Sequence, residues 1–256
     1  MCKVIRYREI MLFVGVLAFC CAGHAQKSPQ DQFDFANGLF HRGFFTEAID
    51  EYERYLDQSP DSAEASTAWL RLGRSAMAIE AHDKALNAFD HAASAAQTPV
   101  TRFEALASRG EALFVAGRHD EAITVLTEVN GAEMPAGLRA RALFYLGRAH
   151  YALGALEKAE VSLSTLATEF PNDELAPFAH YYAGFVCIEM ERHEAAAVAF
   201  SAAANAQHAD PELRMESRFR AAELYDMLGW TAAALGAYEQ LRTDFPDSDY
   251  ARRADY

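Results

Sequence analysis

Small and bulky apolar residues recur along this chain at helical spacing, and the pattern itself repeats. In each unit a small residue is followed four positions later by a bulky apolar one, which places both on one face of a helix. The pairs are Ala48/Tyr52, Ala85/Phe89, Ala122/Leu126, Ala159/Leu163, Ala196/Phe200 and Ala234/Tyr238. Successive alanines lie 37 residues apart, and the last two lie 38 apart. This near-constant period predicts a repeat architecture from about residue 31 to residue 250.

A second apolar segment precedes each alanine, so two helices per unit are expected. Trp69-x-x-Leu72-Gly73 begins sixteen residues before Ala85, and Leu143-x-x-Leu146-Gly147 begins at the same distance before Ala159. Antiparallel helices approach closely only where side chains are small, so the glycines should face the alanines of the second helix. The glycines in this position are Gly73, Gly110, Gly147 and Gly184.

The residues that interrupt the apolar pattern agree with helical hairpins. A glycine between the two helices of a unit can end the first helix in a left-handed conformation, and a proline after the second helix helps to terminate it. The glycines are Gly43, Gly117, Gly154 and Gly229, and the prolines are Pro60, Pro171 and Pro246. Each unit therefore reads as one antiparallel helical hairpin.

The order W-x-x-L-G, then A-x-x-x-F, then P resembles the tetratricopeptide repeat, over roughly residues 31–250. The period of 37 departs from the usual 34, and we expect the extra residues in the second helix or in the following loop. The resemblance implies an all-α fold, a right-handed α-solenoid of about six hairpins. One hairpin cannot bury its apolar face alone, whereas stacked neighbours bury a continuous core.

The first 25 residues are expected to be a secretory signal peptide rather than part of the fold. Lys3, Arg6 and Arg8 precede a short apolar run over residues 10–22, and Gly23-His24-Ala25 supplies small residues for cleavage after Ala25. Cys20 and Cys21 raise the alternative of a lipid-anchored protein, but neither follows the small residues of a Leu-Ala-Gly-Cys motif. The expected location is the periplasm, with the solenoid over residues 26–256.

The C-terminal end leaves one question open. Tyr256 lies only a few residues into what reads as the first helix of a seventh unit. We expect either a short stub or a solenoid that continues past Tyr256, and a longer protein could carry further domains.

Charge and residue content argue against several kinds of chemistry. The formal net charge is −14, which disfavours binding to nucleic acid, because an acidic surface repels phosphate backbones. His193-Glu194 begins like a zinc-protease helix, but Ala197 stands where the second ligand should be. His82, His119 and His193 share one repeat position with Phe45 and Leu156, which indicates packing beside the hairpin turn rather than metal binding. Neither an enzyme activity nor a cofactor is expected.

Family resemblance places the partner-binding residues on the first helix of each hairpin. In tetratricopeptide proteins the face of that helix turned away from the second helix lines the concave side of the solenoid. Carried onto this chain, that face presents Asn37, Phe40, Arg74, Phe114, Phe144, Arg148, Tyr151, Phe178, Tyr181 and Phe185. Aromatic anchors with a few polar donors are suited to a peptide groove. The alternative is that these rings pack against neighbouring helices.

One subtype of the family is disfavoured. Repeats that clamp a chain-terminal carboxylate use a Lys-x-x-x-Asn pair followed by further Asn, Lys and Arg residues. Here the first pair reads Phe33…Asn37, so only Asn37 matches.

The expected function is a non-catalytic scaffold of the cell envelope that binds a protein or peptide segment. Phe170-Pro171-Asn172-Asp173 and the Phe-Pro-Asp-Ser-Asp-Tyr-Ala run at 245–251 resemble repeat junctions of outer-membrane assembly lipoproteins and of Tol–Pal coordinating proteins. Two alternatives stay open. The chain could be the repeat module of a longer exported protease or cell-wall hydrolase, or the solenoid could associate with a copy of itself.

Overall fold

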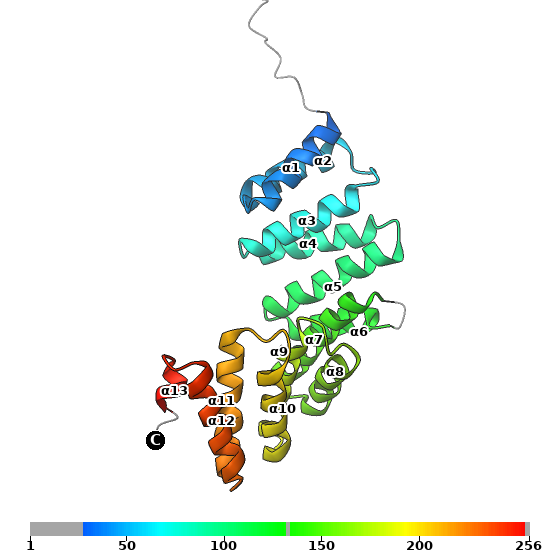
Figure 1. The fold of residues 1–256 in the computed structure, drawn as a ribbon. Coiled ribbons are helices and arrows are strands. Elements are labelled where there is room, and N and C mark those ends of the chain that lie inside the picture. The colour runs from blue at the N-terminus through cyan, green and yellow to red at the C-terminus, as the bar shows by residue number, and fades with distance from the viewer. Residues whose placement is uncertain (1–27, 132–133, 254–256) are drawn as a thin grey trace, which may run out of the picture.

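The computed structural model describes residues 28–131 and 134–253, and all regular structure within them is helical (Figure 1). The helices are α1 (Pro29–His41), α2 (Phe45–Gln58), α3 (Ala65–Ala78), α4 (His82–Ser94), α5 (Pro99–Val115), α6 (His119–Val129), α7 (Ala136–Ala152), α8 (Leu156–Glu169), α9 (Ala176–Glu189), α10 (His193–Asn205), α11 (Pro211–Met227), α12 (Thr231–Asp244) and α13 (Asp249–Arg253). The predicted signal peptide, with Cys20 and Cys21, lies outside the described residues.

Consecutive helices form six hairpins, from α1 and α2 to α11 and α12, and each hairpin packs on the next. Figure 1 shows the hairpins stacked in chain order, with the helix axes turning from across the view at α1 to along it at α11. The short α13 packs on α11 and α12, where the first helix of a seventh hairpin would begin. The prediction of an α-solenoid of about six hairpins is confirmed.

The contact inside each hairpin, which we call the hairpin seam, is formed by a small residue on the first helix and a bulky one on the second. A Cβ atom added to Gly73 would lie 2.5 Å from the Phe89 ring, and one added to Gly184 would lie 2.7 Å from the Phe200 ring. Phe89 and Phe200 are fully buried. The predicted close approach of the helices at these glycines is therefore confirmed. The predicted partner is wrong, because each glycine chiefly faces the bulky residue four positions after the alanine rather than the alanine itself.

The turns inside the hairpins adopt one conformation with two kinds of residue. Gly43, Gly117, Gly154 and Gly229 have φ between 70° and 79°. In the second and fifth hairpins the equivalent residues are Glu80 and Glu191, with φ of 59° and 57°. A side chain in this left-handed region costs about 1–2 kcal/mol relative to the right-handed one, so the stacked hairpins hold these two turns against an intrinsic preference.

The extra residues of the 37-residue repeat lie in two places, only one of which was predicted. Loops such as 59–64 and 170–175 follow the second helices, as expected. However, α5, α7 and α11 are first helices, and each has 17 residues against 13 or 14 in α1, α3 and α9. Thr98 and Asp210 cap α5 and α11, and each is followed by a proline in the first turn, so these helices begin early. The sequence prediction missed this extension.

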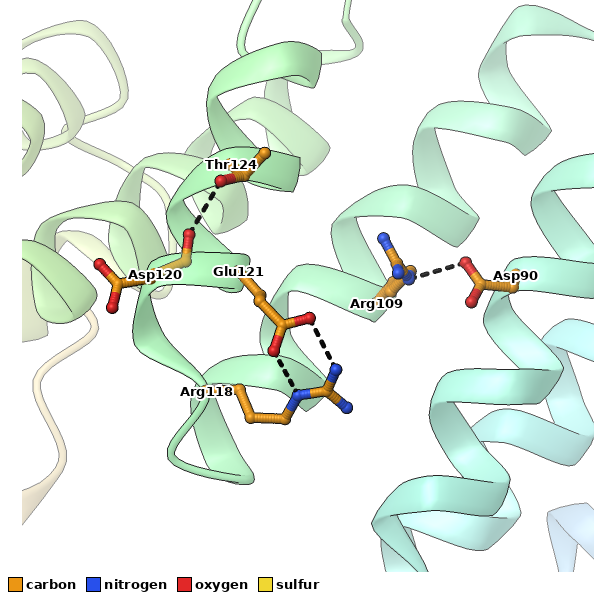
Figure 2. A network of polar contacts seen from close by, with 6 residues as sticks. All are labelled: Asp90, Arg109, Arg118, Asp120, Glu121 and Thr124. Atoms are coloured by element: carbon orange, nitrogen blue, oxygen red, sulfur yellow. Dashed lines mark hydrogen bonds and ion pairs between the residues drawn. The ribbon is translucent and has the colours of Figure 1, made fainter.

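Polar contacts lie away from the seams, both between hairpins and within them (Figure 2). The Arg109 guanidinium on α5 lies 2.7 Å from a carboxylate oxygen of Asp90 on α4, which links the second and third hairpins. Arg118, immediately before α6, donates two hydrogen bonds of 2.7 and 2.6 Å to the Glu121 carboxylate. Both ion pairs are exposed to water, which screens them, so they contribute little to stability.

No helix in the described part of the chain is both long and apolar enough to cross a membrane. Cys187 is buried with a free thiol, and burial raises its pKa. The thiol therefore stays protonated at neutral pH and packs as a small apolar group.

Candidate partner-binding face

The first helices of the hairpins form one continuous side of the solenoid, which we call the inner wall. Successive first helices contact one another from α1 through α3, α5 and α7 to α9, and again from α11 to α13. Successive second helices make no comparable contact within the described residues. Because the hairpins stack more closely on the side of the first helices, the solenoid curves toward the inner wall. The ten predicted site residues all lie on these helices.

At the N-terminal end of the inner wall, the predicted site residues already have partners. Asn37 accepts a hydrogen bond of 2.7 Å from the Tyr52 hydroxyl. Phe40 contacts Phe45 edge to face, with ring centroids 6.0 Å apart. The Arg74 guanidinium on α3 lies 2.7 Å from the Glu104 carboxylate on α5. This end of the inner wall is polar and half-buried.

Rings gather around a single cation in the middle of the inner wall. The Arg148 guanidinium on α7 lies 4.5 Å from the ring centroid of Phe114 on α5 and 4.6 Å from that of Tyr182 on α9. It also lies 5.3 Å from the ring centroid of Phe144. Three consecutive hairpins thus contribute to one cation–aromatic cluster.

Phe144 lies beneath this cluster rather than on its surface. Its side chain is only 5% exposed. Its ring contacts Tyr182 on α9 at 5.8 Å and Phe178 at 6.4 Å between centroids. Phe144 therefore packs against a neighbouring helix, which is the alternative considered for these rings in the sequence analysis. Phe178 and Tyr182, which contact it, are half-buried.

Further along α9, the Tyr181 and Phe185 rings are each partly packed against other side chains and partly exposed. Both are half-buried, and both contact the buried Phe200 ring, with centroids 5.8 and 5.2 Å apart. The Arg220 guanidinium on α11 lies 4.7 Å from the Phe185 ring and also pairs with Glu216 at 2.6 Å. These rings both stabilise the fifth hairpin and contribute surface to the inner wall.

Tyrosine hydroxyls on the inner wall are held in the neutral, donating form. Burial, followed by the hydrogen bond and charge of Glu216, raises the pKa of Tyr181 to about 12. Burial also raises the pKa of Tyr151, which lies half-buried at the C-terminal end of α7. At neutral pH the Tyr181 hydroxyl donates its one proton to Glu216, whereas the Tyr151 hydroxyl can donate a hydrogen bond to a bound chain.

A hollow of about 390 Å³ opens beside the cluster, between α5, α7 and the start of α9. Tyr145 donates a hydrogen bond of 2.8 Å to Glu111 within it, and Arg141 lies 3.9 Å from the same carboxylate. Asp173 and Glu174 complete its acidic rim.

Sequence reasoning missed Tyr182 and Arg220, which take part in the inner-wall clusters. Each stands two residues before the small seam residue of its helix, Gly184 and Ala222 respectively. The prediction chose other positions of the first helix, mainly those one and four residues after the seam. The repeat register could have identified Tyr182 and Arg220, because this register position points toward the neighbouring hairpin.

The histidines at the hairpin turns begin second helices, as their shared repeat position predicted. His119 lies 5.2 Å from Phe114, ring centroid to ring centroid. Within the described residues, no three His, Cys, Asp or Glu side chains lie close enough together to hold a metal ion.

Comparisons with known proteins agree with this architecture. Family models described as tetratricopeptide repeat match residues 33–100, 70–135, 113–176 and 216–248. The chain is thus an α-solenoid of helical hairpins. It belongs to the tetratricopeptide repeat family, whose members are generally non-catalytic scaffolds. No curated protein matches it significantly in sequence.

Several solved structures share the fold. PilW, described as a widely conserved type IV pilus biogenesis factor, is 18% identical with a TM-score of 0.66, covering 91% of this chain and 100% of that one. PilF of Pseudomonas aeruginosa is 16% identical with a TM-score of 0.64, covering 88% and 95%. YrrB, described as a TPR protein with an unusual peptide-binding site, is 20% identical with a TM-score of 0.56, covering 75% and 92%. At these identities the likeness shows the fold.

Proposed function

We propose that this chain is an exported, non-catalytic scaffold of the cell envelope that binds a protein or peptide segment along its inner wall. The observation that carries the proposal is the run of half-buried rings on α5, α7 and α9, interrupted by Arg148. Such rings supply large areas that lose water on binding, while the Arg148 guanidinium and the Tyr151 hydroxyl orient the bound chain.

Export to the envelope rests on two independent supports. The N-terminal sequence has the basic head, short apolar core and small residues of a signal peptide. PilW and PilF have a similar fold, and PilW is described as a type IV pilus biogenesis factor. Pili are assembled at the cell envelope, so this likeness supports an envelope location. The binding of a peptide is supported by the description of YrrB.

Site-directed photo-crosslinking in living cells tests the binding face. A photoreactive residue replaces Tyr151 on the inner wall in one variant and Val161, an outward-facing residue of α8 that is 63% exposed, in a matched control. The inner-wall variant should give a discrete crosslinked product that the control does not give. Equal crosslinking from both positions, or crosslinking only from Val161, would contradict the proposed binding face.

Export is tested separately by fractionation. The chain should be recovered from the periplasmic fraction with Gln26 as its N-terminal residue by mass spectrometry. Recovery from the cytoplasm with Met1 retained would refute export, and an acylated Cys20 or Cys21 would establish the lipid-anchored alternative.

A further inference from the structure

Arg148 is a cation on the inner wall that lacks an acidic partner within the described residues. Its guanidinium is stacked among Phe114, Phe144 and Tyr182, and none of its N–H groups donates a hydrogen bond to another described residue. A guanidinium has five N–H donors. The three ring centroids lie within 5.3 Å of the guanidinium, and the rings accept none of its N–H groups in a hydrogen bond, so its donors remain available to a bound molecule.

Arg74 occupies the same repeat position and provides the internal comparison. Each of the two arginines directly follows the seam glycine of its helix, Gly73 or Gly147. The hairpin that follows Arg74 presents Glu104, and the two side chains pair at 2.7 Å. The hairpin that follows Arg148 presents the Tyr182 ring instead. The same backbone position thus holds a neutralised cation in one hairpin and an unpaired one in another.

Two other inner-wall arginines that lie over rings also pair with carboxylates, and a third, Arg71 over Phe33 at 5.9 Å, lies beside the Tyr52 hydroxyl. Arg220 lies over Phe185 and pairs with Glu216 at 2.6 Å, and Arg253 lies over Phe219 with Glu223 at 3.7 Å. Within the described residues, Arg148 lies over aromatic rings as Arg220 and Arg253 do, but no carboxylate pairs with it.

We propose that Arg148 receives one acidic side chain, an internal Asp or Glu, of the segment bound along the inner wall. This inference rests on the proposed function and deepens it. Contacts with three rings hold the guanidinium in position before binding, and a carboxylate can accept two parallel hydrogen bonds from it. The carboxylate would take the place that Glu104 takes beside Arg74.

Charge elsewhere on the chain sets the register of the bound segment. The formal net charge is −14, and the hollow beside the cluster carries Glu111, Asp173 and Glu174. Acidic residues of a partner are therefore repelled over most of the surface and attracted at Arg148. The flanking residues of the segment should be apolar, because they face the half-buried rings of Tyr151, Phe178 and Phe185.

Selection from a peptide library tests the inference. Random 12-residue peptides are displayed as fusions with both ends blocked, so that a chain-terminal carboxylate is absent, and are selected on the full chain. The selected peptides should share one Asp or Glu between apolar residues. Replacing that residue by Gln or Asn in a synthetic capped peptide should weaken binding to the unmodified protein by about tenfold to a hundredfold, the range for hydrogen bonds to a charged group.

Two matched variants locate the effect. On Arg148→Gln the acidic and the amide peptide should bind equally, whereas Arg74→Gln should keep the full difference. Arg148→Lys keeps the charge but lacks the planar fork, so it should show a reduced difference. This variant also serves if Arg148→Gln fails to fold by circular dichroism.

The outcomes separate the inference from the proposed function. Selected peptides without a shared acidic residue, an undiminished difference on folded Arg148→Gln, or wild-type behaviour of Arg148→Lys would overturn the role of Arg148 and leave the scaffold function standing. If no peptide is enriched and no partner crosslinks to position 151, the proposed function fails and the inference fails with it.

Discussion

The hairpin seam and the inner wall are built from the same helices but follow opposite rules. At the seam, equivalent positions keep the same character in every hairpin, with glycine or alanine against a bulky apolar residue. On the inner wall, the position directly after the seam residue reads Asn37, Arg74, Glu111, Arg148, Phe185 and Glu223. Repetition at the seam sets the spacing of the hairpins, and variation on the inner wall gives each hairpin its own surface. Changes at the seam should therefore alter stability, whereas changes on the inner wall should alter binding.

The largest effect on stability is expected from Ala159→Leu. Ala159 is completely buried in the seam of the fourth hairpin, next to Gly147 on α7. Overpacking a close helix contact costs about 1–3 kcal/mol, and three added carbon atoms in a site without free space should cost about 3 kcal/mol. Urea unfolding followed by circular dichroism measures the loss. A change below about 1 kcal/mol would show that the seam tolerates bulk and would break the comparison.

Gly147→Ala should destabilise the protein by about 2 kcal/mol, since even one methyl group is too large there. Its Cβ would lie 2.7 and 2.8 Å from atoms of Leu163, which is fully buried and cannot move aside.

Gly236→Ala is the matched control for this change. Gly236 lies in the interior of α12, and an added Cβ would have no neighbour within 4 Å. The substitution should stabilise the protein by about 0.5–1 kcal/mol, because glycine is a poor helix former. If both substitutions shift the urea midpoint in the same direction, close packing is not the reason for the seam glycines.

On the inner wall, Tyr151→Ala should change affinity and leave stability nearly intact. The ring is half-buried at the end of α7, whereas the seam side chains are fully buried. Aromatic anchors at the centre of an interface contribute about 2 kcal/mol or more to binding. Titration of the crosslinked partner or a selected peptide, with a melting curve beside it, measures both quantities. A large drop in melting temperature with unchanged affinity would place this ring in the core.

The double variant Tyr181→Ala, Phe185→Ala tests the same distinction between an effect on binding and an effect on stability. Both rings contact Phe200, so the double variant should lose affinity and also some stability, while its helices persist. Loss of the helical circular dichroism signal would show that these two rings serve the fold alone.

The smallest effect is expected in the turns. Glu80→Gly should stabilise the protein by up to about 1 kcal/mol, because the left-handed φ of 59° no longer strains a side chain. Gly117→Ala, at φ of 75° in the next hairpin, should do the opposite by a similar amount. Differential scanning calorimetry of both variants checks the two signs.

The seam could be predicted from sequence because its chemistry is local and repeated. A small residue twelve positions before each alanine has one structural explanation, so the hairpins and their number followed directly. The turn conformation was only partly predictable, since Glu80 and Glu191 adopt a backbone that the sequence suggests only for glycine.

The inner wall was less predictable because burial there depends on the angle between neighbouring hairpins. Phe144 and Phe178 were both expected on the surface, but the approach of α7 to α9 covers Phe144. Arg148 was identified as a polar residue of this face, yet its isolation from any carboxylate depends on which residue the next hairpin presents. Such relations between hairpins are not visible in the pattern of one repeat.

Within the described residues, each hairpin packs mainly on its immediate neighbours, and this has an evolutionary consequence. A duplicated or deleted hairpin disturbs two junctions and leaves the remaining ones as they were. The inner wall can therefore lengthen or shorten by whole hairpins during evolution. The cation–aromatic cluster around Arg148 uses residues of three adjacent hairpins, so it is inherited only when those three hairpins stay together.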